Sequence, residues 1–353
     1  MDQIKSLVRK SVQTFSPYLS ARRLGGQASV WVNANESPNS TEYQLTSNIF
    51  NRYPEGQPAE LIGAYARYAG IDPSKVVVTR GADEAIELVM QVFCEPGQDR
   101  IAFCSPTYGM YRVNADKYGI AVNELTLNED WTFNITELEK QLTDVKLVFI
   151  CNPNNPVGTL TALENIEKLL QITAGKAMVV VDEAYIDFTM ENSAINLLKK
   201  YPNLIILRTL SKAFALAGLR CGFILTSEEV VSQVLKIIAP YPIAQPVADI
   251  AIQALTDEGV QWMQQNVQAI LSARDQFVRE LKQSAWVDFV CETAANFVLV
   301  RFKEKDRIFH YLSDLGILVR PQAGHSMLED CVRITIGTES ECQKLIDALK
   351  TFQ

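Results

Sequence analysis

The sequence predicts an α/β protein with a large domain, built on a mostly parallel sheet between helices, and a smaller α+β domain. Three observations predict this fold class: apolar runs that alternate with helical stretches from residue 75 onward, a change to continuous helical periodicity after residue 250, and a length of 353 residues. That length corresponds to about two domains of roughly 150 residues each. Strands that are apolar along their whole length are typical of parallel sheets buried on both faces.

Six short runs rich in Val, Ile, Leu and Phe predict the strands of the large sheet. These runs cover residues 75–79, 100–104, 146–151, 177–182, 204–208 and 220–225. A helical pattern over 82–93 follows the first run. Because strands and helices alternate, we expect helices on both faces of one sheet, in a large domain that spans residues 45–250.

The two ends of the chain have a different character. Residues 251–283 have helical periodicity without an intervening strand, and we expect them to lead out of the large domain. A small domain is then predicted from strands at 296–301, 317–319 and 331–335 and a last helix from Ser340. The connecting helix and this small domain together span 251–353. Residues 1–44 are rich in loop-forming residues, and we expect this N-terminal segment to pack with the small domain or a partner subunit.

Composition excludes several classes of protein. The chain has 33 basic and 41 acidic residues, a net charge of -8, and no Lys/Arg block, so it lacks the electrostatic pattern of a nucleic-acid or anionic-membrane binder. No apolar run approaches the roughly 18 to 20 residues that cross a bilayer, and the first 15 residues lack a signal-peptide core. Seven scattered cysteines without a CxxC motif and two histidines argue against disulfides and a metal site. We therefore expect a cytoplasmic enzyme with no metal, no nucleic-acid partner and no membrane partner.

A lysine stands just beyond the fifth predicted strand. Thr209, Ser211 and Lys212 follow the run 204–208, and Arg220 comes eight positions after the lysine. A lysine amine can form an imine with an aldehyde, while Ser211 and Arg220 can bind a phosphate. Because Ser-Lys pairs are also common in solvated loops, this motif does not identify a site by itself.

An aspartate ends the fourth predicted strand, and a tyrosine follows it. Asp182 comes directly after four apolar residues, where an unpaired buried carboxylate is costly. A protonated pyridine nitrogen would be a suitable cationic partner, and Tyr185 can donate to a phenolate oxygen. The alternative is a helix N-cap aspartate beside a core tyrosine.

Two other strand ends carry a polar turn and an aromatic residue. The turn 151–158 (CNPNNPVG) can present Asn155 as a donor, although Asn and Pro also dominate turns for backbone reasons. Tyr108 follows the run 100–104 and can stack on a planar ring or fill the core.

The strand–glycine–helix junction at 79–85 is a candidate phosphate site. The free backbone N–H groups of Ala82 and Asp83 suit an anion, but many helices begin with acidic residues for the dipole alone. The sequence contains no GxGxxG after the first strand, no GxxxxGK[ST], no GxSxG and no HExxH. The signatures of NAD enzymes, nucleotide triphosphatases, serine hydrolases and zincins are therefore absent.

Taken together and in this order, these motifs resemble the pyridoxal-phosphate (PLP) aminotransferases of fold type I. The stretch 209–220 (TLSKAFALAGLR) matches the lysine signature of class II members, and nearly the whole chain is similar to the histidinol-phosphate aminotransferases. Further matching stretches are 20–26, 51–57, 80–84, 238–242 and 332–335. Two positions depart from the family: Val157, where Thr is usual, and Ser37, where Asn or Tyr often precedes the proline.

The resemblance implies a role for each motif. Lys212 would bind the cofactor aldehyde covalently and then serve as general base and acid, with a pKa lowered by neighbouring cations. Asp182 would keep the pyridine nitrogen protonated. The other implied cofactor contacts are Asn155 and Tyr185 to the phenolic oxygen, Ser211, Arg220, Thr209 and the amides of Ala82 and Asp83 to the phosphate, and Tyr108 to the ring face.

The resemblance also implies substrates and a partner subunit. Tyr53 would reach the cofactor phosphate of the other subunit in a homodimer. Arg333 would bind a substrate anion, with Arg320 and Tyr18 as secondary candidates. The implied reaction converts L-histidinol phosphate and 2-oxoglutarate to imidazole-acetol phosphate and glutamate, in histidine biosynthesis. Alternatives are a related enzyme for aromatic amino acids, a phosphothreonine decarboxylase, or a non-catalytic PLP-binding protein, against which the presence of Lys212 argues.

Overall fold

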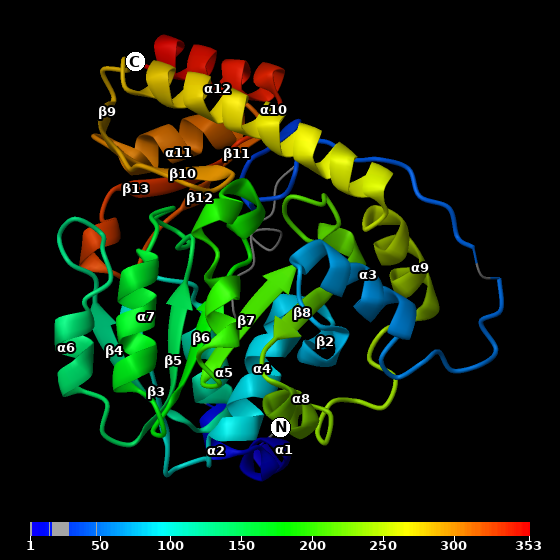
Figure 1. Cartoon of the computed structure of the whole chain (residues 1–353). Helices are drawn as coiled ribbons and strands as arrows, with labels where there is room; N and C mark the ends of the chain where they lie inside the picture. Colours follow the sequence, from blue (N-terminus) through cyan, green and yellow to red (C-terminus); the bar gives the residue numbers. More distant parts are fainter. Residues whose placement is uncertain (1, 14, 16–27, 47) are drawn as a thin grey trace.

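The computed structural model describes residues 2–13, 15, 28–46 and 48–353, and its largest unit is a seven-stranded sheet (Figure 1). The strands lie in the order β2-β8-β7-β6-β5-β3-β4. They are β2 (Val76–Thr79), β3 (Arg100–Ser105), β4 (Ala121–Thr126), β5 (Val145–Cys151), β6 (Met178–Asp182), β7 (Leu204–Thr209) and β8 (Gly222–Leu225). All neighbouring pairs from β7 to β4 are parallel, whereas β8 is antiparallel to β2 and β7. This confirms the predicted mostly parallel sheet.

The apolar runs form strands because both faces of the sheet are covered. In β6, Val179 and Val181 pack on one face and Val180 on the other, and all three are fully buried. One face is covered by α4 (Gly81–Phe93), α5 (Met110–Tyr118) and α8 (Glu228–Val234). The other is covered by α3 (Ala59–Ala69), α6 (Ile135–Lys140), α7 (Leu163–Ile172) and α9 (Gln245–Ala254).

A second unit lies across the carboxyl ends of the parallel strands, at the top of Figure 1. Its antiparallel sheet has the order β12-β13-β10-β9. The elements of this unit are α10 (Asp257–Leu281), β9 (Val287–Val290), β10 (Phe297–Phe302), α11 (Lys305–Asp314), β11 (Ile317–Leu318), β12 (Arg320–Pro321), β13 (Cys331–Thr335) and α12 (Glu339–Thr351). The N-terminal segment joins it, because β1 (Val30–Trp31) pairs in parallel with β11.

The remaining elements are short. They are α1 (Asp2–Leu7), α2 (Lys10–Gln13), η2 (Pro73–Lys75), η3 (Ile186–Phe188), η4 (Met190–Asn192), η5 (Ala194–Lys199), η6 (Ala217–Leu219) and η7 (Ser326–Leu328). The helical pattern at 251–283 belongs to two helices, since α9 ends before Thr256, whose side chain caps α10. None of the helices among the described residues combines the length and the apolarity that a bilayer crossing requires. The division into 1–44, 45–250 and 251–353 stays a prediction.

Candidate active site

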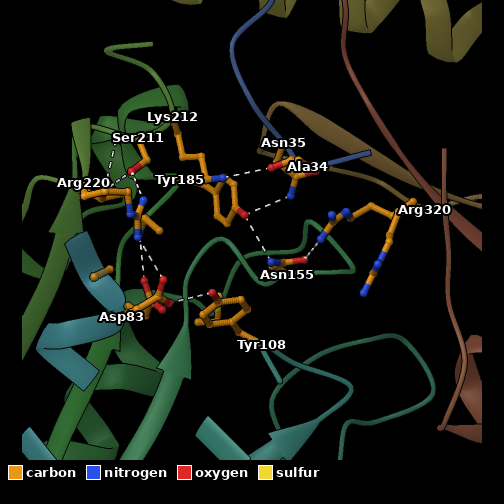
Figure 2. A pocket seen from close by; sticks show the side chains of 16 residues that line it. Ala34, Asn35, Asp83, Tyr108, Asn155, Tyr185, Ser211, Lys212, Arg220 and Arg320 are labelled. Atoms are coloured by element: carbon orange, nitrogen blue, oxygen red, sulfur yellow. Dashed lines mark hydrogen bonds and ion pairs between the residues drawn. The ribbon is translucent and has the colours of Figure 1, made fainter. Parts of the chain in front are cut away.

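A cavity of about 200 Å³ lies between the carboxyl ends of the parallel strands and the small sheet. It brings together most of the residues predicted from the sequence: Ala82, Asp83, Tyr108, Asn155, Asp182, Tyr185, Thr209, Ser211, Lys212, Arg220, Arg320 and Arg333. Its lining also includes Ala34, Asn35, Cys151 and Ala184, which the sequence analysis did not single out. Figure 2 shows these side chains converging from both units.

Lys212 lies just beyond β7, is half-buried and lines this cavity. Its Nζ donates a hydrogen bond to the backbone oxygen of Ala34 (3.2 Å) and lies 5.6 Å from the centre of the Tyr185 ring. Burial and, second, the positive charge of Arg333 lower the pKa of Lys212 to about 8. An amine with this pKa is partly neutral, and therefore nucleophilic, near neutral pH.

Asp182 ends β6 and is almost fully buried. Its carboxylate accepts hydrogen bonds from the Tyr111 hydroxyl (2.8 Å) and from the backbone N–H of Ala184 (3.1 Å). Burial raises the pKa of Asp182 to about 6, while these two hydrogen bonds oppose the rise. Among the residues that the structure describes, no Lys or Arg forms an ion pair with this carboxylate, which suits a cationic ring nitrogen of a ligand.

Tyr111 is a site residue that the sequence analysis missed. Its ring stacks on Phe149, with ring centres 4.7 Å apart, and its hydroxyl is fully buried. The available signal was its spacing. Tyr111 follows Tyr108 by three residues, so both side chains lie on the same side of the chain, at the start of α5.

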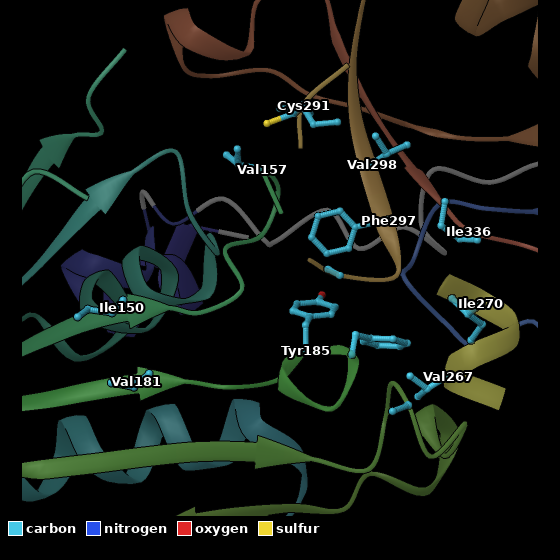
Figure 3. Packing of buried hydrophobic residues seen from close by; sticks show 14 of the residues in the cluster. Ile150, Val157, Val181, Tyr185, Val267, Ile270, Cys291, Phe297, Val298 and Ile336 are labelled. Atoms are coloured by element: carbon cyan, nitrogen blue, oxygen red, sulfur yellow. The ribbon is translucent and has the colours of Figure 1, made fainter. Parts of the chain in front are cut away.

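A chain of hydrogen bonds joins the small sheet to Tyr185. The Arg333 guanidinium on β13 donates to Asn155 Oδ1 (2.6 Å) and to the Asn33 carbonyl (2.9 Å). Asn155 Nδ2 and Asn35 Nδ2 donate to the Tyr185 hydroxyl oxygen, at 3.2 Å and 3.0 Å (Figure 2). The Tyr185 ring itself packs edge-on against Phe297 of β10 (Figure 3).

The start of α4 approaches Arg220 closely enough to form an anion-binding corner. Arg220 Nη1 lies 3.5 Å from Ser211 Oγ, and Nη2 lies 3.2 Å from an oxygen of Asp83. A Cβ at Gly81 would lie 2.8 Å from Arg220 Nη2, and one at Gly222 would lie 2.6 Å from the Gly81 carbonyl carbon. Only glycines permit this approach, which leaves the first backbone N–H groups of α4 beside a guanidinium.

Three of the predicted tyrosines differ from the other site residues. Tyr108 lines the cavity, but its hydroxyl donates to Asp83 (2.8 Å) and its ring meets Tyr111 edge-on. Tyr53 lies outside the cavity, 80% exposed, and stacks on Tyr241. Tyr18 lies outside the described residues.

The two family departures occupy different surroundings. Val157 is fully buried in the core that also contains Cys291 (Figure 3), so an apolar residue fits this point of the turn. Ser37 is half-buried, and its Oγ accepts a hydrogen bond from Asn266 (3.0 Å).

Comparisons with known proteins agree with this geometry. Residues 18–349 match the family described as aminotransferase class I and II. The chain is 50% identical to histidinol-phosphate aminotransferase 1 of Pasteurella multocida, over 98% of this chain and 99% of the relative. It is 48% identical to the histidinol-phosphate aminotransferase of Cronobacter sakazakii, over 98% of this chain and 96% of the relative.

A solved structure has the same fold. The histidinol-phosphate aminotransferase of Sinorhizobium meliloti, solved in complex with pyridoxal-5'-phosphate, superposes with a TM-score of 0.88 over 98% of this chain and 96% of that chain, at 23% identity. The sequence matches span nearly the full length of both proteins. The chain therefore belongs to the class I and II aminotransferase family, among its histidinol-phosphate aminotransferases.

Proposed function

We propose that this protein is a PLP-dependent aminotransferase that converts L-histidinol phosphate and 2-oxoglutarate to imidazole-acetol phosphate and glutamate, a step of histidine biosynthesis. One observation carries the proposal: a lysine with a lowered pKa and a buried aspartate with a raised pKa line one cavity at the ends of neighbouring strands. The substrate assignment rests on the names of the full-length relatives.

The residues of the cavity fit PLP. The cofactor offers an aldehyde, a pyridine nitrogen, a phenolic oxygen and a phosphate, and the cavity has a chemically matched group for each. Those groups are the Lys212 amine, the Asp182 carboxylate, the Tyr185 hydroxyl with the Asn155 amide, and the corner of Ser211, Arg220, Thr209 and the amides of Ala82 and Asp83. The glycines at 81 and 222 leave the phosphate corner free of a Cβ. When bound, PLP would serve as an electron sink for the reacting carbon of the substrate.

Lys212 would be the catalytic acid and base. Because its pKa is about 8, Nζ could take up the proton that leaves the substrate carbon and then donate it at the other end of the 1,3-proton shift that amino-group transfer requires. The positive charge of Arg333 favours the neutral form that accepts the proton. Asp182 would hold its charge against the ring nitrogen, with its carboxylate oriented by Tyr111 and the Ala184 amide.

Arg333 and Arg320 would bind the anionic groups of the substrates. They face each other as register partners on β13 and β12, and both line the cavity from the small-sheet side. Each guanidinium can bind a carboxylate or phosphate through two parallel hydrogen bonds. Tyr18 would be a third contact to the substrate.

We further propose a cytoplasmic homodimer in which Tyr53 reaches the partner's site. Leu45, Ile49 and Phe50 precede Tyr53 and are all more than half exposed, and Tyr241 stacks on Tyr53 at the same surface. An exposed group of large apolar side chains of this kind is typical of a subunit interface. The seven cysteines are all buried and free, as expected in a reducing compartment.

Spectral titration of the purified protein tests the substrate assignment. Histidinol phosphate should bleach the visible absorbance of the PLP-loaded protein, and 2-oxoglutarate should restore it. Phenylalanine should bleach it with much lower affinity, and phosphothreonine should release no carbon dioxide. Preference for phenylalanine, or release of carbon dioxide from phosphothreonine, would favour an aromatic aminotransferase or a decarboxylase instead.

A further inference from the structure

Asn35 reaches the cavity from the N-terminal segment and contacts Tyr185 directly. Its side chain is 1% exposed, and Nδ2 donates to the Tyr185 hydroxyl oxygen (3.0 Å). The residue has a left-handed backbone (φ 55), a conformation that Asn tolerates better than most residues. A buried Asn in this conformation beside a cofactor-contacting tyrosine needs a reason, because burial of an amide is costly unless its hydrogen bonds are made.

Thr335 fixes the orientation of the Asn35 amide. The Asn35 backbone N–H donates to Thr335 Oγ1 (2.8 Å), so the hydroxyl proton of Thr335 is left for another acceptor. That acceptor is Asn35 Oδ1, at 3.2 Å. With Oδ1 held by the hydroxyl, Nδ2 must face Tyr185, and Asn35 can only be a donor to it.

Arg333 fixes the other amide in the same way. Its guanidinium has donors only, and it binds Asn155 Oδ1 at 2.6 Å, which turns Asn155 Nδ2 toward Tyr185. The phenol oxygen of Tyr185 thus accepts two hydrogen bonds, one for each lone pair. Its own proton must then point away from both amides.

We propose that Asn35 is a positioning residue that, together with Asn155, holds the Tyr185 hydroxyl with its proton directed into the cavity. This proposal rests on the proposed function, in which the proton meets the phenolic oxygen of PLP. Without Asn35, water can enter and accept the Tyr185 proton, so the hydroxyl rotates away from the cofactor. The contact also ties Tyr185 to β13 of the small sheet through Thr335.

A pH titration of the visible absorbance of the PLP-loaded protein tests the proposal. The Tyr185 proton stabilises negative charge on the phenolic oxygen, so its loss should make the bound cofactor retain its own proton to higher pH. Tyr185→Phe should raise the titration midpoint by about 1 to 2 pH units. Asn35→Gly, which keeps the left-handed backbone without strain, should raise it by at least about 0.5 unit.

A double variant separates positioning from a general structural effect. If Asn35 acts through the Tyr185 hydroxyl, Asn35→Gly should produce no further shift in the Tyr185→Phe background. An equal shift in both backgrounds, or none in the wild-type background, would overturn the role of Asn35. As a second test, Thr335→Val should raise the titration midpoint as Asn35→Gly does, and Thr335→Ser, which keeps the hydroxyl, should not. The reverse result would also overturn the role of Asn35.

Failure of the proposed function gives a different result. Suppose that the wild-type protein takes up PLP and its visible absorbance titrates with pH. If the absorbance of Asn35→Gly then titrates with the same midpoint, only the positioning role is refuted. A wild-type protein that takes up no PLP refutes both proposals. The PLP dissociation constant of each cofactor-free variant, measured beside its circular dichroism spectrum, distinguishes these results from misfolding.

Discussion

Burial gives two ordinary side chains at this site unusual pKa values. Desolvation raises the pKa of Asp182 to about 6 and lowers that of Lys212 to about 8. Near neutral pH the first therefore stays mainly ionised while the second becomes partly neutral. Their positions could be predicted because parallel strands end at one edge of a sheet. The hydrogen bonds of Tyr111 to Asp182 and of Asn35 to Tyr185 could not, since they join residues 71 and 150 positions apart.

Tyr111→Phe should weaken PLP binding more at low pH than at high pH. Its hydroxyl stabilises the ionised form of Asp182, so its loss should raise the pKa of Asp182 above about 6. On acidification, Asp182 then takes up a proton at a higher pH than in the wild type, and its neutral form no longer binds the ring nitrogen as an ion pair. We expect affinity for PLP to fall about 3-fold at pH 8 and more than 10-fold at pH 6, on the scale of one charge-assisted hydrogen bond.

Fluorescence titration of the cofactor-free protein with PLP at both pH values measures this effect. Tyr118→Phe is the control, because Tyr118 lies on the same helix and its hydroxyl binds Glu87 instead. A Tyr111→Phe protein whose affinity has the same pH dependence as the wild type would contradict the role assigned to Tyr111.

At the scale of elements, the strands of the large sheet that are buried on both faces were predictable, and the exposed edge strand β4 was not. β5, β6 and β7 consist of apolar runs whose residues are nearly all buried, so composition alone revealed them. β4, at one edge of the sheet, has only one buried residue and a polar sequence, so no apolar run predicted it. The antiparallel direction of β8 was also not predictable, because it depends on the turn that carries Lys212 and Arg220.

Gly222→Ala should disrupt the junction between β8 and α4. The added methyl would lie 2.6 Å from the Gly81 carbonyl carbon and 2.7 Å from the Ala82 nitrogen, both backbone atoms that cannot move aside cheaply. We expect a loss of about 1–3 kcal/mol in the free energy of unfolding, together with weaker PLP binding. Gly218→Ala is the matched control, since a Cβ there meets no atom within 4 Å.

Denaturant unfolding of the two cofactor-free variants measures this difference. PLP titration then reports on the phosphate corner separately. Equal stability of Gly222→Ala and Gly218→Ala would show that the close approach of β8 to α4 is not required.

At the scale of the whole molecule, the cavity of a single chain is lined by every predicted cofactor contact except Tyr53. The cavity joins strand ends of the large sheet to β12 and β13 of the small one, so substrate anions that bind Arg320 and Arg333, as we propose, would lie against the cofactor side. The motifs along the chain predicted this arrangement of two units. They could not predict the exposed surface that Leu45, Ile49, Phe50 and Tyr53 form, because exposed apolar side chains in a loop follow no periodic pattern.

Phe50→Glu should convert the proposed dimer into a monomer, because a charge at an apolar interface is costly to desolvate. Activity should fall more than 10-fold, because Tyr53 would no longer reach a partner's site. Sedimentation velocity at micromolar concentration measures the mass. Leu315→Glu is the control, since Leu315 is 49% exposed beyond α11 and far from the segment 45–53 in sequence. A fully active wild-type monomer would contradict the dimer.

The most direct test of the proposed function is to identify the lysine to which PLP attaches. The PLP-loaded protein is reduced with borohydride, digested, and its peptides are analysed by mass spectrometry. We expect one pyridoxyl-phosphate adduct, on Lys212. It should disappear in Lys212→Ala and remain in Lys199→Ala. An adduct on a different lysine, or a wild-type protein that carries none after reduction, would contradict it.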